Sequence, residues 1–384
     1  MSAMSRKWRT VLTGAVPLMA VALATPACAQ DVEEPGIVLG ASYITDILTV
    51  ADGGVRRGTA WLGRADLTVA IDGRAIGLDG IAVFADLLAT QPTDFSGRIV
   101  GDGQTVSNVQ ADSAIRPFEA WIEAQASEAT AVKAGLIDLN TEFDIQSTGA
   151  LFLHSSHGIG PDFSQSGANG PSIFPSSSTA IVVRHTRGKV RLRAGLFDGI
   201  AGSVADPRRS AIRFPGSRGA LLVAEIEHRI GRSGEVQLGA WRYTDRFDAL
   251  DPTRPRVVSQ GAYALIEGPL GRGIDGWVRV GVADDRTNPI GLYLGGGIAH
   301  GPPHSRIGVA VAHARLGMPA RRSLIDGHVA DRAETALELT WARRVVEGVV
   351  VQPAVQYVIN PGWNPATLNA LVIGARLRFA LAID

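Results

Sequence analysis

The sequence predicts an all-β protein, a transmembrane antiparallel β-barrel of about 16 strands. Three observations lead to this fold class. Apolar and polar residues alternate over many short segments, glycine accounts for 45 of 384 residues, and the first thirty residues have the pattern of an export signal. Frequent glycine with few helical patterns indicates many turns, and therefore many strands.

The alternation has a period of two residues, which is the period of a β-strand. Between residues 189 and 197, Lys189, Arg191 and Arg193 share one face, and the residues between them are apolar. Segments 61–72 and 371–379 show the same pattern. In 118–125 the two faces are Phe118, Ala120, Ile122 and Ala124 on one side, and Glu119, Trp121, Glu123 and Gln125 on the other.

Roughly sixteen such segments can be placed along the chain, most of them near the ~10 residues that a tilted strand needs to cross a bilayer. Short turns are expected at 186–188, 231–234 and 345–348, and longer connections at 89–116 and 139–178. The predicted strand centres are residues 43, 66, 84, 121, 134, 183, 193, 224, 239, 263, 280, 295, 310, 338, 354 and 375.

Alternation alone also fits a soluble β-sandwich, because sandwich strands bury one face as well. The export signal, the number and length of the strands, and the charges of both signs on the polar faces favour a barrel with a wet lumen. A bilayer accepts strands only where every backbone N–H and C=O group is paired, which requires closure. The aromatic content of 6% counts against this fold, because it is modest for a barrel with two aromatic girdles.

Residues 1–29 are predicted to be a signal peptide, and 30–384 a single barrel domain. Residues 6–9 carry three basic side chains, an apolar run follows, and the small residues at 27–29 suit cleavage. Two alternatives stay open, an N-terminal membrane anchor and lipid attachment at Cys28.

Composition excludes several classes of function. The only cysteine, Cys28, lies in the predicted signal peptide, which excludes thiol catalysis, cysteine metal sites and disulfides from the mature chain. Beyond residue 29 there are 34 basic and 37 acidic residues, so the balance gives no sign of a nucleic-acid-binding patch. We expect no cofactor.

Several stretches, which together cover nearly the whole mature chain, resemble the OprB-type carbohydrate-selective porins in matching order. The most distinctive stretch, Ala134–Asp144, continues through Leu151–Phe163. The other stretches are Gly53-Gly54 with Arg57-Gly58, Gly170–Pro175, Ala194–Gly199, Gln356–Gly362, and Asn364-Pro365 with the final strand.

This resemblance implies an outer-membrane barrel of sixteen strands that lets small sugars diffuse passively and is not an enzyme. The implied partners are small sugars, membrane lipid and the barrel-assembly machinery, with no nucleic acid; association into a homo-oligomer stays open. One feature departs from the usual pattern of outer-membrane strands, which commonly end the chain on an aromatic residue. Here Phe379 is followed by five further residues.

A sugar-selective pore needs groups that exchange hydrogen bonds with hydroxyls, and an aromatic ring for the sugar C–H face. Strand parity places Trp121 between Glu119 and Glu123 on the predicted lumen face. Its alternative role is in an interfacial girdle or under a loop. Lys133, Arg191 and Arg193 also point to the lumen by parity, and the alternative is that they merely solvate the wall.

The connection after residue 137 is long enough to fold inward and narrow the channel. Its individual acids are somewhat better explained by a structural role, holding the loop to the wall. The candidate residues in it are Asp138, Asn140, Glu142, Asp144, His154, His157 and Asp162.

The His154–His157 cluster allows two sharper interpretations. As a metal site, it offers two imidazoles, but no recognised ligand spacing completes it. As a hydrolase site, His157 would activate a serine, but the chain has no nucleophile motif. Two alternatives to a porin stay open. One is an outer-membrane enzyme that uses these histidines, and the other is a soluble periplasmic sugar-binding β-protein.

Overall fold

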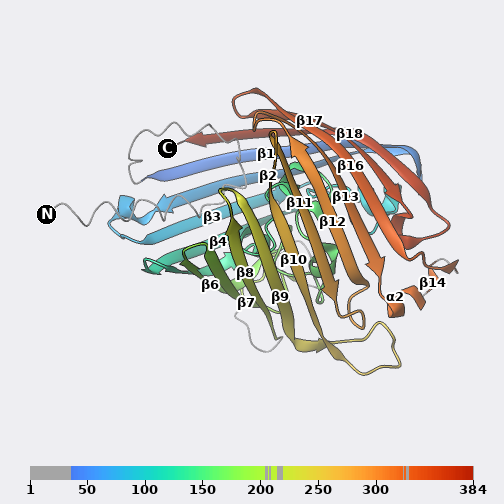
Figure 1. The fold of residues 1–384 in the computed structure, drawn as a ribbon, viewed down its shortest axis with the longest axis horizontal. Coiled ribbons are helices and arrows are strands. Elements are labelled where there is room, and N and C mark those ends of the chain that lie inside the picture. Colours follow the sequence, from blue (N-terminus) through green and yellow to red (C-terminus); the bar gives the residue numbers. More distant parts are fainter. Residues whose placement is uncertain are drawn as a thin grey trace.

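The computed structural model describes residues 36–203, 206, 209–213, 219–322, 324–325 and 328–383. Sixteen strands in this part of the chain form one closed antiparallel barrel. Each strand pairs with its neighbour along the chain, and β18 closes the barrel on β1 (Figure 1). The predicted signal peptide, residues 1–29, lies outside the described residues.

The sequence forms these strands because apolar and polar residues alternate along them, so that each strand has a lipid face and a lumen face. In the first half of the barrel the strands are β1 Ile37–Gly54, β2 Gly58–Asp72, β3 Ile81–Thr90, β4 Ala114–Ser127, β5 Thr130–Ile137, β6 Ser178–Arg187, β7 Val190–Asp198 and β8 Ala220–Ile230. In the second half they are β9 Gly234–Phe247, β10 Val257–Gly271, β11 Ile274–Ala283, β12 Ile290–His300, β13 Ser305–Leu316, β16 Ala333–Val346, β17 Val349–Ile359 and β18 Leu368–Ile383.

The predicted barrel is confirmed, and all sixteen predicted strand centres fall inside barrel strands. The final strand continues past Phe379 as far as Ile383, and Ile383 still pairs with Leu39 of β1. The residues after the aromatic position therefore extend the closing seam of the barrel.

The connections 91–113 and 138–177 leave the barrel at the same end, because every second connection of an antiparallel barrel lies at one end. A separate two-stranded sheet is made of β14 Leu324–Ile325 and β15 His328–Val329. No helix in the described ranges is long and apolar enough to cross a bilayer. The helices are η3 Gly73–Ile76, η4 Ser96–Val100, η5 Leu139–Thr141, η6 Gly149–Leu151, η7 Ser155–His157, α1 Pro161–Ser164, α2 Met318–Arg322 and η8 Pro361–Trp363.

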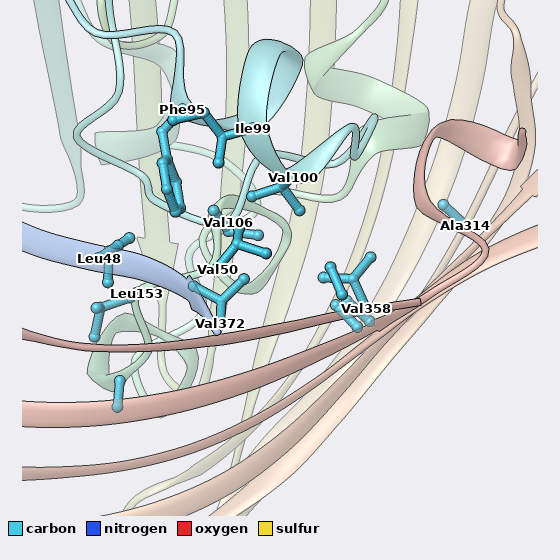
Figure 2. Packing of buried hydrophobic residues seen from close by; sticks show 14 of the residues in the cluster. Leu48, Val50, Phe95, Ile99, Val100, Val106, Leu153, Ala314, Val358 and Val372 are labelled. Atoms are coloured by element: carbon cyan, nitrogen blue, oxygen red, sulfur yellow. The ribbon is translucent and has the colours of Figure 1, made fainter. Parts of the chain in front are cut away.

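Two long connections turn back into the barrel, and we call residues 91–113 the first inward loop and 138–177 the second inward loop. The first inward loop packs Phe95, Val100 and Val106 against the inner wall around Leu48 and Val372 (Figure 2). Burial of these side chains inside the barrel stabilises the loop because it removes apolar surface from water. The lumen is therefore narrowed by a packed internal core.

The outward face of the strands is apolar. Leu67, Ile122, Leu192, Leu238 and Leu337 are all exposed there, on five different strands. An exposed apolar band of this kind suits contact with lipid chains rather than with water.

One predicted parity is wrong. Phe118 was expected to share the outward face with Ala120, but its side chain is buried and lies beside Arg64 and Phe174 inside the barrel. The pairing of β4 with β3 shifts at this point, because Pro117 pairs with Leu87 while Glu119 pairs with Asp86. This β-bulge inserts Phe118 as an extra residue and turns its side chain inward.

Gly135 in β5 has a positive φ of 143°, and a Cβ placed on it would lie 2.2 Å from the carbonyl oxygen of Ala120. We therefore expect Gly135→Ala to lower the free energy of unfolding by about 2 kcal/mol, through backbone strain and overpacking. Urea unfolding in lipid vesicles measures this loss. Gly58→Ala is the control, since its nearest neighbour would be 3.4 Å away. Equal losses in the two variants would contradict the account of Gly135.

Candidate functional site

Glutamates of the barrel wall bind backbone N–H groups of the two inward loops. Each of three glutamates accepts hydrogen bonds from two consecutive N–H groups of a loop, so the carboxylate fixes a short length of chain. Such charge-assisted bonds are stronger than neutral ones. The sets are Glu334 with Gly103 and Gln104 (2.8 and 3.1 Å), Glu267 with Ser147 and Thr148 (3.1 and 3.0 Å), and Glu338 with Leu153 and His154 (2.8 and 2.9 Å).

Arg279 of β11 is the most buried charged contact to the second inward loop. Its guanidinium group lies 2.7 Å from Asp144 and 2.6 Å from Asp162, and all three side chains are 0% exposed. Tyr263 and Tyr293 place their rings 5.1 and 5.4 Å from the same guanidinium carbon. Two of the sequence-predicted residues therefore anchor the loop to one wall arginine.

A second charged network joins the loop to β4, β5 and β6. Lys133 forms an ion pair with Glu142 of the loop and lies 3.8 Å from Glu123. Arg184 pairs with Glu123 and reaches Glu142 at 3.5 Å. Burial alone would raise the pKa of Glu142, but the two cations outweigh burial and hold it below its ordinary value. The loop carboxylate is therefore charged and locked in place.

Trp121 lies behind this network and is 5% exposed. Its ring stacks on Phe84 with centroids 5.3 Å apart, and the Lys133 ammonium lies 4.0 Å from the Trp121 ring. The indole N–H donates to Glu119 at 3.2 Å. Parity placed Trp121 on the inner wall between two glutamates, and the structure adds that its ring is covered by neighbouring side chains.

The second inward loop starts with a turn that side-chain hydrogen bonds stabilise. Glu119 accepts from the Asp138 N–H at 3.2 Å, and Asp138 in turn accepts from the Asn140 N–H at 2.9 Å. The Asn140 amide donates to the carbonyls of Phe143 and Asp144 at 3.2 and 3.0 Å. Burial raises the pKa of Asp138 to about 6, with its bond from Asn140 opposing the rise. These side chains shape the loop.

The two lumen arginines of β7 face carboxylates of β8. Arg193 is buried and pairs with Glu225 and Glu227. Arg191 lies 3.0 Å from Glu227 and keeps 22% of its side chain exposed. Arg193 therefore stabilises the wall through its ion pairs, whereas Arg191 reaches the solvent of the lumen.

His154 and His157 lie in a dry, aromatic part of the second inward loop. The His154 Nδ1 accepts from the Ser156 N–H at 3.3 Å, but His154 Nε2 and both ring nitrogens of His157 have no hydrogen-bond partner among the described residues. Phe152 and Trp277 lie 5.1 and 5.8 Å from the His157 ring. Burial lowers the pKa of His154 to about 3, and burial together with His154 lowers the pKa of His157 well below its ordinary value.

Nor does the described part of the chain bring three or more His, Cys, Asp or Glu side chains together in a way that could hold a metal ion. The barrel, its inward loops and its charged inner wall are the arrangement of a channel.

A family model described as the carbohydrate-selective porin, OprB family, matches residues 56–381. The chain belongs to this family. It is therefore an outer-membrane porin, as the strand pattern and the resemblance predicted. A search of curated proteins found no match to the sequence.

Solved structures agree with the fold of this porin. It is similar to OprB of Pseudomonas putida, with 18% identity and a TM-score of 0.76 over 90% of this chain and 94% of the other. A triple mutant of the Rhodopseudomonas blastica porin gives 13% identity and a TM-score of 0.54 over 90% and 100%. The channel DcaP of Acinetobacter baumannii gives 7% and 0.55 over 91% and 97%.

Sequence reasoning missed the wall residues that hold the porin's inward loops. These were Arg184, Arg279, Glu225, Glu267, Glu334 and Glu338. Parity could have placed them on the inner face, since each sits on a predicted strand. It carried no information on which of them would meet a loop from far along the chain.

Proposed function

We propose that sugars cross this porin by passive diffusion beside the partly exposed charges of the inner wall, Glu123, Arg184 and Arg191. Their side chains are 13, 16 and 22% exposed, unlike the fully buried charges around Arg279. A carboxylate accepts and a guanidinium donates hydrogen bonds, so together they suit neutral hydroxyls. Glu123 and Arg184 already form an ion pair with each other. A hydrogen bond from either residue to a passing sugar therefore replaces part of that pairing, which keeps sugar binding weak.

We assign the other predicted path residues to narrowing and shaping the bore. Asp144 and Asp162 hold the second inward loop to Arg279, and Glu142 holds it to Lys133. Trp121 supports the path from behind by fixing Lys133. The other residues that we assign to shaping the bore are Glu119, Asp138, Asn140, His154, His157 and Arg193.

We further propose that the porin performs no catalysis. A general base needs a partner that orients it, and neither ring nitrogen of His157 has one among the described residues. Residues 1–29 are proposed to be removed on export. Membrane lipid and the barrel-assembly machinery are the proposed partners.

Swelling of liposomes that contain the porin tests the proposed path. We expect monosaccharides to enter faster than amino acids of equal size.

Ion-current recordings test the role of Arg184 in the path. Arg184→Gln should weaken the block of ion current by glucose about fivefold, the equivalent of about 1 kcal/mol for a lost hydrogen bond. Arg187→Gln is the control, since Arg187 lies on the exposed part of the same strand. Unchanged block in Arg184→Gln would remove Arg184 from the path.

A further inference from the structure

Two arginines of the inner wall lie in one row near the short turn between β16 and β17. Arg344 pairs across the sheet with Val350, and Val350 pairs with Arg378 of β18. Residues directly opposite each other in a sheet point to the same face. Arg378 donates to Gln352, which donates in turn to the carbonyl of Leu151, so this row borders the second inward loop.

These two arginines differ from the other arginines around them. Arg306 pairs with Asp275 at 2.5 Å, and Arg376 pairs with Asp46 at 2.7 Å. No ion pair of Arg344 or Arg378 is found among the residues that the structure describes. In the described part of the wall, these two neighbouring cations therefore lack an ion-pair partner, and the carboxylate of Asp46 is taken by Arg376.

Part of their hydrogen-bonding capacity is also unused, although Arg378 donates to Gln352. Nε and Nη2 of Arg344 and Nε of Arg378 are buried without a partner in the described ranges. Buried donors left unpaired cost free energy, and two like charges in one row repel each other. Both costs fall if an anion lies between the guanidinium groups. Neighbouring strands are ~4.8 Å apart, so these two arginines, two strands apart, can reach one oxyanion with their long side chains.

We propose that Arg344 and Arg378 form a weak anion site that favours passage of sugars carrying a carboxylate or phosphate. This rests on the proposed function, because the sugar must first pass the second inward loop. Guanidinium groups match both oxyanions with parallel N–H donors. Although these nitrogens are buried, both side chains as a whole are partly exposed, so the site borders the aqueous bore.

Single-channel recordings of the full porin test this site with four probes: glucose, glucuronate, glucose 6-phosphate and inorganic phosphate. We expect glucuronate and glucose 6-phosphate to block the ion current at lower concentration than glucose. Arg344→Gln with Arg378→Gln should raise both blocking constants about tenfold, the effect of a lost charge-assisted hydrogen bond. Arg344→Lys with Arg378→Lys should restore part of the loss.

Arg343→Gln is the matched control, because Arg343 is exposed on the neighbouring position of β16 and lies over the outward Trp341. It should leave all four blocking constants unchanged. Equal block by glucose and glucuronate in the unchanged porin would overturn the site. So would a loss of anion block in Arg343→Gln as large as in the double variant. Block by inorganic phosphate alone would also overturn it, because the ligand would not be a sugar. Failure of glucose to enter at all would instead overturn the proposed function.

Discussion

Replacing Arg279 with methionine is expected to lower the free energy of unfolding of the barrel by about 3–5 kcal/mol. Arg279 is the partner of Asp144 and Asp162, and the three side chains are wholly buried. Methionine fills similar space but leaves two carboxylates without a cation, and an unpaired buried charge is costly. Urea unfolding in lipid vesicles measures the loss.

Two further variants separate the charge effect from packing. Asp144→Asn and Asp162→Asn, added to Arg279→Met, should recover much of the loss because no buried charge remains. Arg286→Met should leave stability unchanged, since Arg286 pairs with Asp284 on the exposed surface. If the triple variant were no more stable than Arg279→Met alone, the ion pairs would not be what holds the second inward loop.

Acidification is expected to loosen the second inward loop through His154 and His157. Their pKa values are lowered in the folded protein, His154 to about 3. In the unfolded chain these two histidines take up protons below about pH 6.5, whereas in the folded loop they stay neutral there. Stability is therefore lost as pH falls from about 6.5 towards 3, by about 1.4 kcal/mol per pH unit for each histidine.

Buried loop carboxylates act in the opposite direction. Burial raises the pKa of Asp102 and Asp138 to about 6, so the folded protein takes up these protons first and is stabilised as the pH falls. The histidine effect is obtained by subtraction, comparing the porin with a His154→Asn, His157→Leu variant from pH 7 to pH 4.5. The variant should lose less stability across that range. Parallel curves would rule out the histidines as the cause.

The barrel could be predicted from sequence because its strands repeat a simple physical pattern. Each strand has one face toward lipid and the other toward water, so that apolar Leu192 is followed by charged Arg193 regardless of how the loops fold. Closure then follows from the need to pair every backbone group. The Phe118 bulge could not be foreseen, because it depends on the register between β3 and β4 rather than on the pattern within β4.

The candidate site was only partly predictable. The acids of the second inward loop could be identified as a group, since Asp144 and Asp162 lie in one polar connection. Their shared partner, Arg279, is more than a hundred residues away, and no local pattern links them. Parity also placed Trp121 on the inner wall, but it carries no information on what covers its ring.

The most direct test of the account is the ion current through single molecules of the porin in a planar bilayer, with and without glucose. We expect stepwise conductance that glucose reduces reversibly, because ions and sugar share one bore past the second inward loop. A membrane-inserted barrel that conducts no ions, or a conductance that glucose never affects, would contradict it.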